Sequence, residues 1–276
     1  MCAALGLVSA AGCGGEPERE PAVAKPAVTL NHTRVPIGSP MTLTYRFEVA
    51  PDARIDGDYT VFVHVLDPDG EQLWTDDHAP AIPTSAWKPG QVVEYPRTIF
   101  APNYPYIGEA HIRIGLYRGD ARLTLDGTEV GRKEYAVAKF QLLPQSENVF
   151  LIYKDGWHPS EVAADNAATE WQWTQKAATV SFRNPKKDVV LYLEADARPD
   201  LVPAPQQVTI RIGDQTVASF RADFREKRLL TFPITATQLG AGEMTELVIE
   251  VDRTFSSPGD ARELGLRVFH AFVDPR

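Results

Sequence analysis

The sequence predicts an all-β protein built from two consecutive antiparallel β-sandwich domains. Apolar and polar side chains alternate with a period of two, as in residues 41–49, which is the pattern of a half-buried strand. Turn sequences such as Asp67-Pro68-Asp69-Gly70 separate the alternating segments. No window of helical length shows a 3.6-residue period. Short strands with frequent turns are typical of sandwiches.

Each strand is predicted from this alternation. In the first half we expect strands at 59–66 and 111–117, and a hairpin that joins 123–125 to 129–130 across Asp126-Gly127. In the second half we expect a tight turn at Gly213-Asp214, one helical turn at 235–239 and a weak helix at 162–169. Further strands are expected at 149–153, 178–182, 189–193, 208–212, 217–220, 247–251 and 264–272.

Length and composition set the domain limits. The 276 residues suffice for two domains, which we place at 28–144 and 145–276. The preceding segment 13–27 is rich in proline and glutamate and is predicted to be an extended tether. The net charge of −9, without a basic stripe, opposes binding to nucleic acid.

The N-terminal residues are expected to act as a targeting signal. An apolar run leads into Ala10-Ala11-Gly12-Cys13, and this stretch resembles the bacterial lipobox. The resemblance implies that residues 1–12 are a signal segment, that Cys13 receives the lipid, and that the protein is exported and anchored in the cell envelope, facing the periplasm or the exterior. No Lys or Arg precedes the apolar run. This leaves three alternatives: the true start lies upstream, the segment is retained as an anchor, or it is a disordered apolar terminus with an incidental cysteine. Cys2 and Cys13 are the two cysteines, so cleavage before Cys13 would exclude a disulfide.

Several motifs resemble known accessory domains. Segments 58–74, 83–93 and 112–117 resemble an immunoglobulin-like domain of bacterial envelope proteins and membrane glycosyltransferases. Residues 146–276 resemble a second, jelly-roll-like accessory sandwich, through segments 156–161, 171–173, 253–255 and 262–265. Such modules accompany enzymes, so the resemblance implies no catalysis.

The second domain holds the candidate ligand-binding residues. Tryptophan rings stack on sugars, and arginine with carboxylate supplies hydrogen bonds to hydroxyls. Trp171 and Trp173 share one face of a strand because they are two residues apart. The alternative is that the tryptophans fill the core, the commoner use in sandwiches, and that Arg253 ties a loop to Glu161. We expect that Trp171 and Trp173 do not both carry function. The candidate set is Trp157, Glu161, Trp171, Trp173, Arg253 and Arg262.

Signatures of catalysis, metal binding and cofactors are absent from the sequence. His64, His111 and His270 fall within strand patterns and are expected to be packed or hydrogen-bonded. Segment 67–71 has acidic residues but lacks a calcium loop, and 76–78 is expected to be a surface loop. Trp74 and Trp87 are expected to pin the long loop of the first domain.

These observations leave three hypotheses. The leading one is a non-catalytic envelope lipoprotein, without cofactor or metal, that acts as an interaction or structural subunit docked on a larger membrane-associated assembly. The second is a carbohydrate-binding module that uses the aromatic residues of the second domain. The third is an unrecognised glycan hydrolase, because two carboxylates at the right separation leave no sequence motif.

Overall fold

The computed structural model describes residues 20–103, 105–165, 169–198, 204–257 and 259–276. The chain divides into two compact units. The first unit comprises the residues up to 31 together with 42–97 and 109–140. The second comprises 32–41, 98–108 and 141–276. Two excursions from the first half of the chain therefore belong to the second unit.

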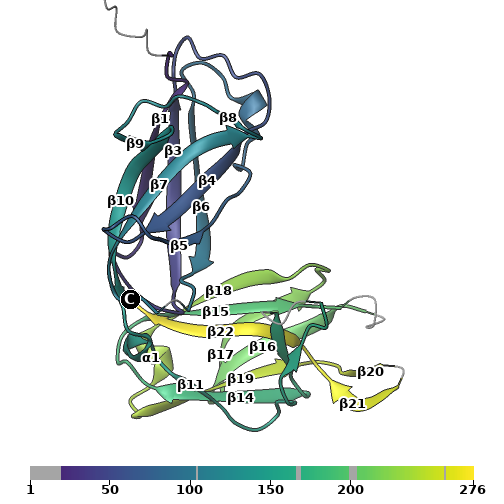
Figure 1. The fold of residues 1–276 in the computed structure, drawn as a ribbon. Helices are drawn as coiled ribbons and strands as arrows, with labels where there is room; N and C mark the ends of the chain where they lie inside the picture. The colour runs from purple at the N-terminus through teal and green to yellow at the C-terminus, as the bar shows by residue number, and fades with distance from the viewer. Residues whose placement is uncertain (1–19, 104, 166–168, 199–203, 258) are drawn as a thin grey trace, which may run out of the picture. The chain divides into compact units, whose positions relative to one another are not determined.

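The first half of the chain forms two sheets, as a sandwich requires (Figure 1). One has the order β1-β3-β6 and the other β2-β10-β7-β4-β5, with β8 on β7 and β9 on β10. The pair β2–β10 is parallel, whereas β1–β3, β4–β5, β4–β7, β7–β8 and β9–β10 are antiparallel. The bounds are β1 Ala24–Leu30, β2 Arg34–Pro36, β3 Pro40–Val49, β4 Thr60–Leu66, β5 Gln72–Thr75, β6 Val92–Phe100, β7 Gly108–Arg118, β8 Ala121–Arg122, β9 Glu129–Gly131 and β10 Glu134–Leu143.

The core of the first unit follows the predicted alternation. Tyr45 and Phe47 of β3 and Ile112 and Ile114 of β7 are fully buried, and the predicted strands at 41–49, 59–66 and 111–117 are confirmed. The predicted hairpin across Asp126-Gly127 is wrong. β9 pairs with β10, and the backbone of Asp126 instead donates to Ala24 O at 2.8 Å.

Two further expectations for the first unit are resolved by side-chain contacts. Trp87 is buried, contacts Phe47 and donates from Nε1 to Ile82 O at 2.9 Å, so it pins the loop as expected. The expectation for Trp74 is wrong, because Trp74 lies within β5 and packs edge-on against Phe140.

The prediction that segment 76–78 is a surface loop holds for Asp77, which is exposed, but is wrong for His78. His78 is buried, and its Nε2 lies 2.9 Å from the hydroxyl of Tyr95. Asp76 accepts two hydrogen bonds from Arg97, at 2.7 and 2.8 Å. Burial lowers the pKa of His78 below its ordinary value. The network exists because the segment pairs with β4 through Val61, which draws its side chains inward.

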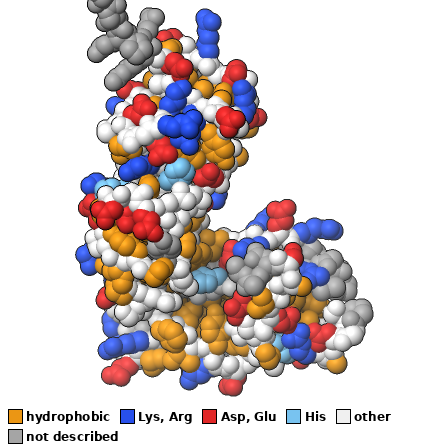
Figure 2. All heavy atoms as spheres, in the orientation of Figure 1, with side chains coloured by type: hydrophobic (Ala, Val, Ile, Leu, Met, Phe, Trp, Pro, Cys, Tyr) orange, Lys and Arg blue, Asp and Glu red, His pale blue; other side chains and the backbone are white. Residues whose placement is uncertain are grey.

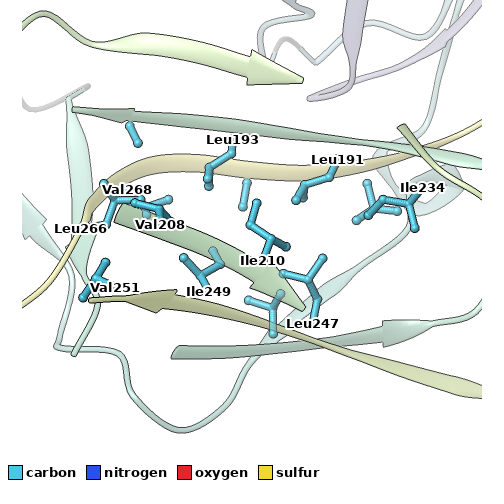
Figure 3. Packing of buried hydrophobic residues seen from close by; sticks show 14 of the residues in the cluster. Leu191, Leu193, Val208, Ile210, Ile234, Leu247, Ile249, Val251, Leu266 and Val268 are labelled. Carbon is cyan, nitrogen blue, oxygen red and sulfur yellow. The ribbon is translucent and has the colours of Figure 1, made fainter. Parts of the chain in front are cut away.

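The second unit contains two five-stranded antiparallel sheets, confirming the all-β class (Figure 1). Their orders are β11-β14-β19-β16-β17 and β12-β13-β22-β15-β18, and we call the latter the β22 sheet. Apolar side chains of both sheets, among them Leu191, Ile210 and Ile249, meet between them (Figure 3). The bounds are β11 Leu151–Tyr153, β12 Glu161–Val162, β13 Glu170–Trp173, β14 Ala177–Arg183, β15 Val189–Asp196, β16 Gln206–Ile212, β17 Gln215–Ala222, β18 Arg228–Ile234, β19 Met244–Val251, β20 Phe255–Ser257, β21 Asp260–Leu264 and β22 Arg267–Pro275.

Local sequence explains most of these elements. Gly213 adopts a left-handed conformation (φ 55°) and turns β16 into β17, as predicted. The predicted helical turn at 235–239 is α1, Ala236–Leu239, which Thr235 and Gln238 close with a capping box. The predicted helix at 162–169 is wrong for its described residues, because 161–162 form β12, which pairs with β13. The predicted strand at 264–272 is interrupted at Gly265 and Leu266, where β21 ends before β22 begins.

The predicted signal segment 1–12, the lipidation site Cys13 and tether residues up to 19 lie outside the described residues. The tether prediction is wrong for 24–27, because these residues belong to β1, which pairs with β3, and Ala24 is buried. The first sandwich therefore begins before residue 28. None of the helices in the described part of the chain has the length and apolarity needed to cross a bilayer. On the face that Figure 2 shows, acidic and basic side chains are interspersed with apolar ones.

Candidate functional site

A hollow of about 580 Å³ lies beside β13 and β22 in the second unit. We call it the Trp171 hollow. Segment 98–108, strands β11, β13, β15 and β22, and the chain just before β18 contribute to its walls. The lining residues are Phe100, Asn103, Tyr153, Thr169, Glu170, Trp171, Gln172, Glu194, Lys227, Val268, Phe269 and His270.

The pairing of β13 with β22 explains why this part of the sheet is open. The two strands pair only through Gln172 with Val268 and Trp173 with Arg267. Trp171, the residue before Gln172 on β13, has no partner on β22, and it pairs with Glu161 of β12 across the other edge of β13. The hollow therefore begins where β13 has no further partner on β22.

A β-bulge on β22 supplies the wall opposite Trp171. His270 pairs with Glu194, and Val268 pairs with Ala195, so Phe269 is an extra residue without a partner on β15. A bulge changes the direction of side chains and is a frequent feature of functional sites. Here consecutive aromatic side chains, Phe269 and His270, both line the hollow.

An ion pair beneath the aromatic rings fixes their positions. Arg267 donates two hydrogen bonds to Asp196, one of them from Nε at 2.8 Å, and the Asp196 side chain is only 4% exposed. The Arg267 guanidinium lies 5.2, 5.6 and 5.1 Å from the ring centroids of Trp171, Trp173 and Phe269. At these distances cation–π attraction orders all three rings around one charge.

Two side chains that line the hollow each carry a buried nitrogen without a hydrogen-bond partner. Nε1 of Trp171 and Nε2 of His270 are both buried, and neither meets a partner within the described ranges. The His270 ring contacts Phe100 edge-on, with centroids 4.4 Å apart, and burial lowers its pKa below the ordinary value. Most buried polar groups in proteins are paired, so two orphaned nitrogens in one hollow indicate a place where a ligand supplies the partners.

The charged groups at the hollow leave one negative charge in excess. Lys227 Nζ lies 3.0 Å from Glu194 Oε1, and it also lies 5.3 Å from the centroid of Phe269. Glu170 accepts a hydrogen bond from Ser160, a neutral group. The surrounding protein and the charge of Glu170 raise the pKa of the Tyr153 phenol, which therefore stays neutral at pH 7.

The three candidate tryptophans occupy different environments. Trp171 lines the hollow, whereas Trp173 is 5% exposed and packs edge-on against Phe255. Both contact Arg267, as their shared strand face predicts. Trp157 donates from Nε1 to Thr179 O at 2.9 Å, and its ring contacts that of Tyr153 edge-on with centroids 4.8 Å apart. Trp157 therefore packs behind the lining residue Tyr153 and does not line the hollow itself.

The polar candidates do not line the hollow, and only two of them, Arg262 and Glu161, contact each other. Arg262 pairs with Glu161 at 2.8 Å and also with Asp260. The hydrogen bonds that Asp260 accepts from the Arg262 side chain and backbone lower the pKa of Asp260 to about 2. Arg253 pairs with its neighbour Asp252 at 2.7 Å. The expectation that Arg253 ties a loop to Glu161 is wrong, because Arg262 occupies that place.

Sequence analysis missed most of the lining residues. The Phe269–His270 wall depends on a bulge, and the alternating pattern of 264–272 does not reveal one. Phe100 and Asn103 come from a segment that the sequence assigns to the first domain. The sequence does offer one signal, the glycine at position 265 within the predicted strand. In the structure a Cβ at this position would lie 2.4 Å from the Gln175 carbonyl oxygen. This glycine marks the break before the irregular strand.

The remaining polar motifs have structural partners. Asp67 accepts a hydrogen bond from the backbone of Glu71 at 2.8 Å, forming the expected turn. His64 lies 3.5 Å from Glu134 and His111 lies 2.7 Å from Glu109. Among the residues that the structure describes, no three His, Cys, Asp or Glu side chains are grouped as metal ligands.

No family model and no curated protein matches this chain. Solved structures with some likeness include SGBP-B of the Bacteroides ovatus mixed-linkage glucan utilization locus, in complex with a mixed-linkage heptasaccharide (11% identity, TM-score 0.30, 91% of this chain and 53% of that chain). Another is Salmonella alpha-2-macroglobulin reacted with methylamine (14% identity, TM-score 0.27, 91% of this chain and 15% of that chain). A third is the Clostridium perfringens ZmpB M60 catalytic domain with its CBM51-1 and CBM51-2 domains (9% identity, TM-score 0.25, 86% of this chain and 34% of that chain). The chain spans about half or less of these proteins, and at such TM-scores the likeness assigns no family.

Proposed function

We propose that the second unit binds carbohydrate, without catalysis, in the Trp171 hollow. The observation that carries the proposal is the pair of orphaned buried nitrogens, on Trp171 and His270, among aromatic rings in one hollow. A sugar ring has apolar C–H faces that pack on aromatic side chains. Its hydroxyls both donate and accept, so they satisfy an indole N–H and an imidazole nitrogen in either tautomer.

The test compares Trp171→Ala with Phe150→Ala in the full chain. Phe150 is 80% exposed and does not line the hollow, so it controls for the loss of an aromatic residue. Binding is screened on an oligosaccharide array, and the affinity for soluble β-glucan and chitin oligomers is then measured by calorimetry. We expect Trp171→Ala to weaken the best ligand about five- to tenfold or more, and Phe150→Ala to leave it unchanged. Equal affinities for all three proteins, with unchanged circular dichroism, would reject the site.

We also propose that the protein is a lipid-anchored envelope subunit that positions this binding unit beside a membrane assembly. Phe150 and Ile152, 80% and 45% exposed, are apolar side chains that a protein partner could cover. Mass spectrometry of the native protein should find that it begins at an acylated Cys13. An unmodified Cys13 in a chain that still starts at Met1 would contradict the anchor, and detergent co-purification would test the partner.

A further inference from the structure

We infer that the Trp171 hollow selects uncharged glycans and rejects acidic ones. This inference rests on the carbohydrate-binding function proposed above and adds the charge class of the ligand. It follows from the ionisable groups that face the hollow and from the chemistry of the two orphaned nitrogens.

The lining charges oppose an anionic ligand. Lys227 is the one cation among the described lining residues, and Glu194 already neutralises it at 3.0 Å. Glu170 is exposed and accepts a hydrogen bond from Ser160; no cationic side chain pairs with it among its described contacts, so solvent alone screens its negative charge. Arg267, the nearest guanidinium to the rings, is engaged by Asp196. A uronate or sulfate group in the hollow would therefore meet repulsion from Glu170 without a free cation.

The orphaned nitrogens favour hydroxyl groups. The Trp171 N–H only donates, whereas the His270 ring, held neutral by burial, offers either a donor or an acceptor at Nε2. A hydroxyl pairs with both, whereas a carboxylate or sulfate accepts only and brings a charge into a partly dry site. An uncharged pyranose thus satisfies both nitrogens with no electrostatic penalty.

The experiment uses oligosaccharides of matched length that differ in charge. Neutral cello-oligosaccharides, N-acetylated chito-oligosaccharides and oligomers oxidised to uronates are titrated into the full chain at low and at high salt. We expect at least one neutral series to bind, and its oxidised counterpart to bind about tenfold more weakly at low salt. The difference should narrow as salt screens the repulsion.

Charge variants separate a local effect from a global one. Glu170→Gln keeps an acceptor for Ser160 but removes the lining charge, so it should reduce the discrimination. Glu243→Gln removes an equal charge just before β19, from an exposed residue outside the hollow, and should leave the preference for neutral over oxidised oligomers unchanged. Lys227→Gln should increase the preference for neutral over oxidised oligomers. Equal binding of neutral and oxidised oligomers, or equal effects of the two glutamate variants, would overturn the inference while leaving carbohydrate binding intact. Failure of every oligomer to bind would reject carbohydrate binding itself.

Discussion

Replacing Arg267 tests whether the ion pair beneath the hollow holds the β22 sheet together. Arg267→Leu removes the guanidinium but leaves Asp196, which is 4% exposed, without its partner. Breaking a buried pair on one side costs about 3–5 kcal/mol, because a charge stays buried without compensation. The three ring contacts of the guanidinium, at 5.1 to 5.6 Å, add to this loss at roughly 0.5–1 kcal/mol or more each. The single variant should therefore lose a large part of a stability that is about 5–15 kcal/mol in ordinary domains.

A double-mutant cycle in urea separates these contributions. Asp196→Leu alone should also destabilise, because it leaves Arg267 buried among the rings. The double variant Arg267→Leu/Asp196→Leu should cost much less than the sum of the single changes, since no buried charge remains. Arg267→Lys serves as the charge-conserving control and should lose part of the stability, because lysine cannot form two parallel bonds. A loss below about 1 kcal/mol for Arg267→Leu, or strict additivity in the cycle, would refute the reasoning.

Three further predictions concern single side chains. Trp173→Ala should destabilise the second unit by about 3–5 kcal/mol, because Trp173 is 5% exposed and its removal opens a cavity. Thermal and urea unfolding measure this loss, and a melting curve like that of the unaltered protein would contradict its place in the core. Trp171→Phe removes an unpaired buried N–H, so its free energy of unfolding should stay within about 1 kcal/mol of that of the unaltered protein. The same change should weaken glycan binding in calorimetry, and an unaltered affinity would show that the indole N–H is not used. Because the folded pKa of His78 lies below its unfolded value near 6.5, the unfolded chain binds more protons as pH falls below 6.5 and stability declines there. His78→Gln should flatten that decline between pH 7 and 5, and an unchanged slope would assign it to other groups.

Side-chain alternation predicted the strands where the chain is regular. Segments 41–49 and 208–212 have one buried face and one polar face, so their pattern alone identifies them as strands. Strands β6 and β18 were not predicted. Each contains a proline, Pro96 or Pro233, and a proline within an alternating segment argues against a strand. The hairpin at 123–130 failed because a turn dipeptide indicates a reversal but not which strand the chain pairs with next.

The candidate site was predictable only in part, for the same physical reason. The i, i+2 spacing of Trp171 and Trp173 placed both rings on one strand face, and both do contact Arg267. It could not show that β13 pairs with β22 only through Gln172 and Trp173, which leaves Trp171 at the hollow and Trp173 in the core. Partners distant in sequence, such as Phe100, come from tertiary packing and leave no local signal.

The arrangement around Arg267 links stability to the proposed binding through one group. The guanidinium neutralises Asp196 and also orders the rings of Trp171 and Phe269, which line the hollow. A ring held in place before binding loses little conformational freedom when a ligand stacks on it, so more of the contact energy appears as affinity. The orphaned nitrogens of Trp171 and His270 lower the stability of the free protein, and a ligand that pairs with them recovers that loss. A glycan bound in the hollow should therefore raise the melting temperature of the second unit, and more so in the protein with Trp171 than in its phenylalanine variant.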